Sequence, residues 1–427
     1  MSSALDGIKV IDVSQVAAAP MAARILGDFG ADVIHVENPA AGGDAWRYYQ
    51  QIQTRANYCA PSEFNYNWEN FNRNKRSVTI NLYTEGGRKI IHRMAETADV
   101  FITNLRVYEL ERFELTYESL RQINPKLVYG HLSGYGSEGP ERDRPSFDYI
   151  AYWARTGFEY MLGVGGIPCL GYRAAMGDNV AALALACGVM LALYVREKTG
   201  VGQQISVSLQ HVGLYQISFD ISGALITGLD AADWREMPPV EVQQKAQEAI
   251  SEVLSFYRKK LVNPLDTSYV TKDNRVIHFF AVRPDRYWER FCRAIGRDDL
   301  ATDPRFSTFD GRAQHGPELY QTIAETIASK TLEEWRPLLK DIPCGPVQTL
   351  KEAINDPQAR ASGCFVSYEH PKWGRIEQVA NPIRMSMTPA TVRMAAPELG
   401  EHTEEVLLEI GYSSDDILDF RKQGAIG

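Results

Sequence analysis

The sequence is poor in cysteine, and the few cysteines are not arranged to bind a metal. None forms a C-x-x-C pair, and none has a metal-ligand spacing with any of the eight histidines. We therefore expect no metal, and we interpret all six cysteines as reduced thiols in a reducing compartment, the cytoplasm. They are Cys59, Cys169, Cys187, Cys292, Cys344 and Cys364.

The chain of 427 residues also lacks an excess of positive charge. Its formal net charge is −9, which argues against a nucleic-acid-binding protein, because such proteins need a basic surface. No signal peptide is visible, since residues 1–7 are polar and the apolar run Ile8–Val13 is short. The apolar run Val180–Val195 is shorter than the roughly 20 residues of a membrane span. We predict a buried core helix there and no membrane.

A glycine-rich dinucleotide fingerprint is absent as well. The chain begins with a predicted strand at Ile8–Val13, a helix opened by Ala17–Pro20, and a strand at Asp32–Glu37. This βαβ unit ends in an acidic residue, as dinucleotide-binding folds do. Alanines occupy the turn where G-x-G-x-x-G would be needed, so we predict no nicotinamide or flavin site there.

Strand and helix patterns continue to alternate after this unit. Strands are predicted at Val78–Leu82, Val100–Thr103 and Leu127–Leu132. Helices are predicted at Glu85–Thr97 and Tyr117–Ile123. This alternation predicts an α/β fold with a doubly wound, Rossmann-like parallel sheet.

Composition divides the chain into three parts. We assign residues 1–228 to the large α/β domain. Residues 229–340 begin with a polar, charged linker and form a smaller α+β domain, with a predicted hairpin turn at Lys272–Asn274. Residues 341–427 are predicted to return to the large domain and to end in an amphipathic helix at Thr403–Ile410.

Three cations, Arg73, Lys75 and Arg76, form a cluster among small polar residues at 70–77. A solvated loop explains the cluster as well as a grip for phosphate does. The second interpretation rests on the match between phosphate oxygens and cations or side-chain amides.

Asp178 stands at the head of the apolar run that begins at Val180. An aspartate at this place caps a helix in most proteins. The N–H groups of a helix N-terminus also stabilise an anion, so the same carboxylate could serve as a nucleophile. The local sequence alone favours the cap.

Ordered motifs along nearly the whole chain resemble the class III CoA-transferases, the family of formyl-CoA:oxalate and carnitine CoA-transferases. The motifs are Leu5–Asp12, Gly30–Glu37, Asn72–Ser77, Asn124–Val128, Lys198–Gln203, Ile342–Val347 and Leu399–Leu407. The resemblance implies transfer of CoA from an acyl-CoA to a carboxylic acid without a metal. It also implies an interlocked homodimer, in which each chain is a ring threaded by the other.

The resemblance also implies particular site residues. The family's nucleophile is the aspartate of a Gly-Asp pair that heads the central helix, which here is Gly177-Asp178. Residues matching the family's CoA contacts follow the first strand, lie in the cationic cluster, and follow the strand at Val100–Thr103. They are Val16, Ala17, Ala18, Asn74, Lys75, Asn104, Leu105 and Arg112.

The sequence departs from the formyl-CoA enzyme at Ala17, where that enzyme has glutamine, so oxalate and formate are not expected substrates. Ser146–Ala151 and the long 38–77 segment resemble arylacyl or 2-hydroxyacyl CoA-transferases instead. One alternative is an α-methylacyl-CoA racemase, which needs a second acid/base group. Racemases have a histidine where Phe147 stands here. A non-catalytic CoA-binding subunit is disfavoured by the presence of Asp178.

Aromatic residues are dense in two stretches, and their rings suit either an aryl or branched acyl group or the packing of a core or dimer contact. A dicarboxylic acid, the other alternative, would require a dedicated arginine, such as Arg47, Arg55 or Arg173. The aromatic residues are Trp46, Tyr48, Tyr49, Tyr58, Phe64, Tyr66, Trp68 and Phe71, then Tyr152, Trp153, Phe158 and Tyr160.

Overall fold

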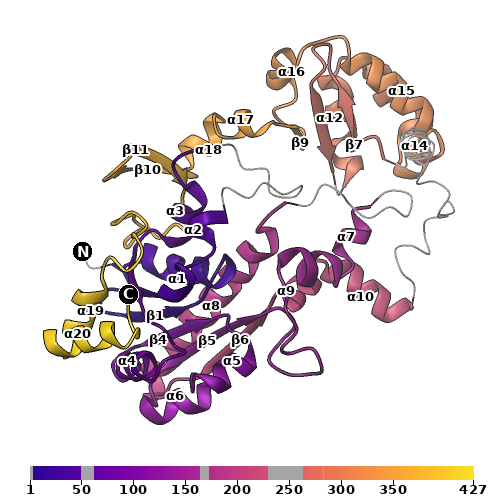
Figure 1. Cartoon of the computed structure of the whole chain (residues 1–427). Helices are drawn as coiled ribbons and strands as arrows, with labels where there is room; N and C mark the ends of the chain where they lie inside the picture. Colours follow the sequence, from indigo (N-terminus) through magenta and orange to yellow (C-terminus); the bar gives the residue numbers. More distant parts are fainter. Residues whose placement is uncertain (1–2, 50–61, 164–172, 229–262, 282) are drawn as a thin grey trace, which may run out of the picture. The chain divides into compact units, whose positions relative to one another are not determined.

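The computed structural model describes residues 3–49, 62–163, 173–228, 263–281 and 283–427 (Figure 1). The described residues form two compact units. The first contains residues 3–163, 173–228 and 363–427, and the second contains residues 263–362.

A six-stranded sheet forms the centre of the first unit. Its strand order is β3-β2-β1-β4-β5-β6, and every neighbouring pair is parallel. The order reverses between β1 and β4, the kind of switch point where open α/β sheets bind ligands at the carboxyl ends of their strands. The predicted doubly wound sheet is therefore confirmed. The strands are β1 Lys9–Val13, β2 Asp32–Glu37, β3 Lys75–Thr79, β4 Val100–Thr103, β5 Val128–Ser133 and β6 Gln204–Ser208.

Helices cover both faces of this sheet because strand side chains alternate between the faces. Val10 packs with α1 and α8, while its neighbour Ile11 packs with α4 and the C-terminal helices. The helices of the first layer are α1 Ala18–Asp28, α3 Tyr66–Asn72, α8 Met176–Thr199 and α9 Leu209–Gln216. Those of the second are α4 Glu85–Ala95, α5 Val107–Arg112, α6 Tyr117–Ile123, α19 Thr403–Glu409 and α20 Ser414–Lys422.

Shorter elements complete the first unit. They are η1 Pro39–Ala41, α2 Trp46–Tyr49, the π-helix η2 Tyr149–Ala154, α7 Phe158–Met161, α10 Ser218–Thr227 and the hairpin strands β10 Phe365–His370 and β11 Gly374–Val379. The chain continues past the expected last helix at Thr403–Ile410 into α20, which Ser413 opens with a capping box.

The strand expected at Val78–Leu82 begins three residues earlier, at Lys75. Its first two residues are cations, which strand patterns disfavour. Both cations have ionic partners in the fold, and β3 is buried along its whole length. The cationic cluster therefore belongs partly to the sheet.

Helix α8 has 24 residues, and thus a length of about 36 Å. It begins four residues before the predicted run and ends at Thr199, because the next residue, Gly200, has a left-handed φ of 72° that terminates the helix. By length and composition α8 could cross a membrane. A single such helix is weak support for a membrane span, and one face, with Ala181, Leu185 and Val189, is buried in the core.

The topology determines which end of α8 faces the ligand edge of the sheet. Helix α8 leads through residues 200–203 into β6, which is parallel to its neighbours. The helix therefore runs opposite to the strands, and its N-terminus points toward their carboxyl ends. The turn between β1 and α1 lies at the same edge, and α1 packs against α8. Asp178 and the Val16–Ala18 turn are thus on one side of the sheet.

The second unit is an antiparallel sheet packed against helices. The predicted hairpin is present, and Asn274 in its turn has a left-handed φ of 57°. The chain was expected to leave this unit at residue 341, but β9 pairs with β8, so the unit extends to Ser362. Its strands are β7 Asp266–Val270, β8 Val276–Phe280 and β9 Cys344–Pro346. Its helices are α12 Pro284–Ala294, α13 Asp298–Thr302, η4 Pro304–Phe306, α14 Phe309–Gln314, α15 Gly316–Ile327, α16 Leu332–Leu338, α17 Leu350–Ala353 and α18 Pro357–Ala361.

Candidate active site

The turn from β1 into α1 contains a backbone conformation that is rare for its residue type. Val16 has a φ of 71°, although a β-branched residue disfavours positive φ. The Val16 N–H donates to Asp44 Oδ2 at 2.9 Å, and burial raises the pKa of Asp44. Ala17 and Ala18 are buried, Val16 is half-buried, and the preceding Gln15 is exposed. A strained turn that is held by hydrogen bonds from distant parts of the chain is typical of a functional site.

Asn104 holds the same turn from the neighbouring strand. Its Oδ1 accepts the Gln15 N–H at 3.0 Å, and its Nδ2 donates to the Gln15 carbonyl at 2.7 Å. The carbonyl of Leu105 is engaged too, by His131 Nε2 at 3.0 Å. The predicted pair Asn104–Leu105 therefore joins the β1 and β4 ends, and its polar side-chain atoms already have protein partners.

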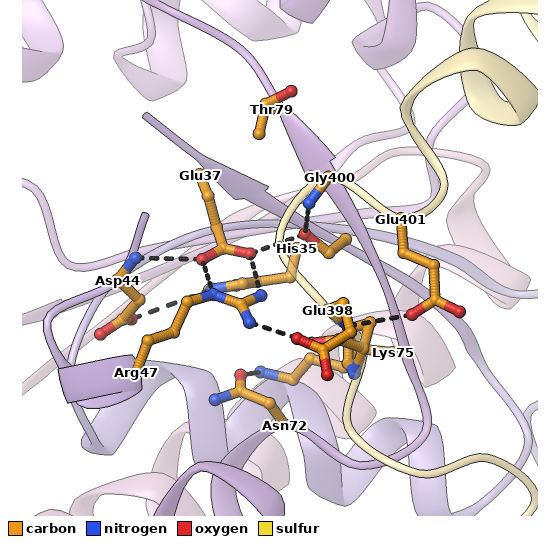
Figure 2. Close-up of polar contacts among 12 residues, drawn as sticks. His35, Glu37, Asp44, Arg47, Asn72, Lys75, Thr79, Glu398, Gly400 and Glu401 are labelled. Carbon is orange, nitrogen blue, oxygen red and sulfur yellow. Dashed lines mark hydrogen bonds and ion pairs between the residues drawn. The ribbon is translucent and has the colours of Figure 1, made fainter. Parts of the chain in front are cut away.

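Lys75 lies in a buried charge cluster beneath this turn. Its ammonium donates to Asn72 Oδ1 at 2.8 Å (Figure 2). It also donates to Asp12 Oδ2 at 2.8 Å. His35 Nδ1 is 2.8 Å from the same Asp12 oxygen, and Ser14 Oγ bonds the other one. Burial alone would raise the pKa of Asp12, but Lys75 and His35 hold it below its ordinary value. Lys75 thus stabilises an internal carboxylate.

Neither sequence interpretation of the cationic cluster describes the structure fully. Arg73 makes two hydrogen bonds to Asp28, at 3.3 and 3.1 Å, and Arg76 pairs with Asp32 at 2.6 Å. Together with the buried Lys75, these contacts contradict the solvated-loop interpretation. They also engage all three cations with carboxylates, so a phosphate would have to compete with those partners.

Asn74 is likewise occupied by the protein. It has a φ of 62° and is fully buried. Its Nδ2 donates to Asp28 Oδ1 and to the Thr391 carbonyl, both at 2.8 Å, and its Oδ1 accepts the Met394 N–H at 3.1 Å. Asn74 therefore binds the C-terminal segment to the sheet.

Arg112 is the exposed cation among the predicted CoA contacts. It lies at the end of α5, with its guanidinium 4.9 Å from the centre of the Tyr83 ring. Its charge is accessible in a way that the charge of Lys75 is not. Of the two predicted cationic contacts, Arg112 is thus the better placed to bind a phosphate directly.

Asp178 lies in the first turn of α8 and is half-buried. Burial, together with the negative charge of Asp148, raises the pKa of Asp178 to about 8. The preceding residue, Gly177, donates its N–H to Asp148 Oδ1 at 3.0 Å. Sequence reasoning did not identify Asp148 as a site residue, because its partner is 29 residues away and no local pattern connects them.

Both aromatic groups contribute side chains to the same core, and in the second group Tyr152 and Trp153 are each only 2% exposed. Trp46, Trp68 and Phe71 are buried in the core around α1, which is the packing interpretation of the first group. In the second group, Tyr152 packs against Gly177, and Trp153 and Phe158 lie 4.9 Å apart edge to face. This second group adjoins Asp178. Tyr49 and Tyr58 are not among the residues whose side chains are described.

The candidate arginines for a dicarboxylate also differ. Arg47 donates two hydrogen bonds to Glu37, at 2.7 and 2.6 Å (Figure 2). Its guanidinium also lies 3.9 Å from the centre of the Trp68 ring. Arg173 is exposed, five residues before Asp178. Arg55 lies outside the described residues.

Comparison with known proteins identifies the family. Residues 5–403 match CoA-transferase family III. The chain is 32% identical to (R)-2-hydroxy-4-methylpentanoate CoA-transferase of Clostridioides difficile, over 98% of both chains. It is also 32% identical to cinnamoyl-CoA:phenyllactate CoA-transferase of Clostridium sporogenes, over 97% of this chain and 95% of that one.

Solved structures agree with the fold. A CaiB/BaiF family protein from Brucella suis superposes with a TM-score of 0.74 at 25% identity, over 96% of this chain and all of that one. The chain therefore belongs to CoA-transferase family III, and it is a CoA-transferase enzyme that uses CoA thioesters as co-substrates.

The contrast between Lys75 and Arg112 can be tested by alanine substitution. We expect Lys75→Ala to lower the free energy of unfolding by about 3–5 kcal/mol, because it leaves a buried carboxylate short of its partner. The lowered pKa of Asp12 stabilises the fold above its unfolded pKa, and this stability is lost as pH falls. Acid unfolding of Lys75→Ala should therefore begin at higher pH. Urea and acid titrations by circular dichroism measure both effects.

Arg112→Ala is the comparison variant, since its side chain is exposed. It should keep the stability of the unsubstituted enzyme and raise the apparent KM for the CoA donor. The assignment is contradicted if Lys75→Ala is as stable as the parent and changes only that KM.

Proposed function

We propose that this enzyme moves CoA from an acyl-CoA donor to a carboxylic acid through a covalent intermediate on Asp178. The observation that carries the proposal is the place of Asp178. It stands in the first turn of helix α8, one face of which is buried in the core, at the same sheet edge as the strained Val16 turn. The residue follows the glycine of the family's Gly-Asp pair, and the chain matches family III across this region.

A carboxylate can carry out this exchange without a large change in free energy. Asp178 attacks the thioester carbonyl, the carbon–sulfur bond breaks, and CoA leaves as a thiolate from a mixed anhydride. The thiolate then attacks the aspartyl carbonyl and releases the donor acid, which leaves an aspartyl-CoA thioester. The acceptor carboxylate reverses the two steps and leaves with CoA, so that Asp178 is regenerated.

Mass spectrometry tests this mechanism directly. Incubation with an acyl-CoA should add an acyl-sized or CoA-sized mass to the peptide that contains Asp178. Asp178→Ala should lose both the adduct and the transfer, because no other group would supply the attacking oxygen. Normal transfer by Asp178→Ala would refute the mechanism. Asp178-dependent exchange of the α-proton in heavy water would instead favour the racemase alternative.

For the acceptor we propose an aryl or branched monocarboxylic acid, such as a 2-hydroxy acid. Beside the head of α8, Tyr152 and Trp153 are packed in the core, and the partly buried Phe158 stacks against both, so Phe158 is the ring that a bound aryl group could contact. The Clostridioides and Clostridium relatives are named for 2-hydroxy-4-methylpentanoate and phenyllactate. Arg47, one candidate for binding a second carboxylate, is neutralised by Glu37.

A competition assay decides between acid classes. With one CoA donor, phenyl-substituted and branched 2-hydroxy acids should be used in preference to succinate-like acids. Phe158→Ala should reduce the preference for the aryl acid, since it removes one ring of the group. A preference for the dicarboxylic acid by more than about tenfold, worth roughly 1.4 kcal/mol, would contradict the proposal. In that case, Arg173→Ala should abolish the preference.

We also propose that the enzyme is a homodimer, as the family resemblance implies. The outer face of α8 exposes Leu191 and Tyr194 by 62% and 61% of their surfaces. On α10, Phe219 is 92% exposed and Ile226 is 85% exposed. Large apolar side chains grouped on exposed helices are typical of a surface that another chain covers. A second copy of this chain is the proposed occupant.

Sedimentation tests the dimer. We expect one species of twice the chain mass that does not dissociate on dilution, because separating interlocked rings requires unfolding. Leu191→Asp places a charge on the apolar face and should reduce the yield of folded dimer, whereas Glu118→Ala on the distant α6 should not. A folded monomer of the unsubstituted chain at low concentration would contradict the proposal.

A further inference from the structure

Asp148 is a buried carboxylate whose position is defined by the backbone next to Asp178. It immediately precedes η2 and is only 4% exposed. Its Oδ1 accepts the Gly177 N–H at 3.0 Å. The N–H groups of Ala175 and Met176 also favour its ionised form. Three successive N–H groups at the head of α8 thus face one internal carboxylate.

The backbone that presents these N–H groups is strained. Ala175 has a φ of 61° and a ψ of 15°, a left-handed conformation that costs a residue with a Cβ about 1 kcal/mol or more. A left-handed residue in front of a helix turns successive N–H groups inward to form an anion-binding concavity. Here, the carboxylate of Asp148 occupies the concavity.

The packing leaves no room for this arrangement to shift. A Cβ added to Gly177 would lie 2.3 Å from Asp148 Oδ1 and 2.3 Å from Tyr152 Cγ. The glycine of the Gly-Asp pair is therefore required by the close approach of Asp148 and Tyr152. Since Asp178 is the next residue, its place depends on the same contact.

We propose that Asp148 is a positioning residue: it fixes the backbone of Ala175, Met176 and Gly177, and it places a negative charge beside the carboxylate of Asp178. The proposal rests on the function proposed above for Asp178. Because Asp148 binds the Gly177 N–H, that donor is not available to Asp178. The carboxylates of Asp148 and Asp178 both lie near the N-terminus of α8, and Asp148 is the one that accepts the Gly177 N–H.

Charged groups on the neighbouring elements α1, β5 and α9 have other partners or are exposed. Arg24 and Asp28 on α1 pair with each other, at 2.5 Å. His131 on β5 binds the Leu105 carbonyl, and His211 on α9 is exposed. Tyr152 is the titratable group packed against Gly177, and burial raises its pKa. Asp148 is the charge that acts on Asp178 together with burial.

The consequence is a nucleophile that is mostly neutral until the pH reaches its pKa. With a pKa of about 8, Asp178 is protonated below that pH, and the ionised fraction that can attack a thioester rises as the pH increases. A neutral Asp178 repels neither the acceptor carboxylate nor the phosphates of CoA. Removing the charge of Asp148 should lower the pKa and make attack efficient at lower pH.

The test measures how acylation of Asp178 depends on pH in three enzymes. Asp148→Asn keeps an oxygen acceptor for the Gly177 N–H and removes the charge. We expect the midpoint of its profile to fall by about one pH unit, so that acylation at pH 6 is faster than in the parent. Asp148→Ala removes the acceptor too, and we expect acylation to fall by about 100-fold at every pH, because the nucleophile is misplaced.

Asp143→Asn is the control, since Asp143 also accepts a backbone N–H, that of Tyr108 at 2.9 Å. It should leave the midpoint unchanged. An unchanged midpoint in Asp148→Asn, with normal adduct formation, contradicts the proposed role of Asp148 but leaves the proposed function of Asp178 standing. If the unsubstituted enzyme forms no adduct on Asp178, the proposed function itself fails. If Asp148→Ala acylates as fast as Asp148→Asn, the positioning role is refuted.

Discussion

The site depends on carboxylates that are buried beneath the carboxyl edge of the sheet. Asp12 lies near the end of β1, where Lys75 from β3 neutralises it and His35 from β2 lies within hydrogen-bond distance. A buried charge that loses its partner is strongly destabilising, so these three strands are held in one arrangement. Because the turn after β1 starts from this fixed strand, the positions of the turn and of the N-terminus of α1 are fixed as well.

The same structural device occurs twice at this edge. Val16 and Ala175 both have left-handed φ values that their side chains disfavour, and each begins or immediately precedes a turn into a long helix. A buried carboxylate from elsewhere in the chain accepts an N–H of each turn: Asp44 at Val16, and Asp148 at Gly177. Burial raises the pKa of both carboxylates, because the surrounding protein solvates their charges less well than water does.

Local patterns predicted the elements well, but not the partners that complete them. Alternation gave the parallel sheet, and the apolar run gave α8, because both depend on residues close together in the chain. The cationic cluster was ambiguous because Lys75 pairs with Asp12, 63 residues away. The first aromatic group was ambiguous too, since only the folded chain shows that Trp46 and Trp68 pack around α1.

The absence of glycine from the first βα turn has a structural meaning. In dinucleotide-binding folds, glycines let the backbone approach a pyrophosphate whose oxygens accept N–H groups at the helix start. Here the Val16 N–H is already bound by Asp44, and the alanines at 17 and 18 are buried. The turn is therefore closed by an internal anion. A CoA molecule at this edge would contact the outer surface of a preformed turn. Accessible cations such as Arg112 would then pair with the phosphates of the CoA.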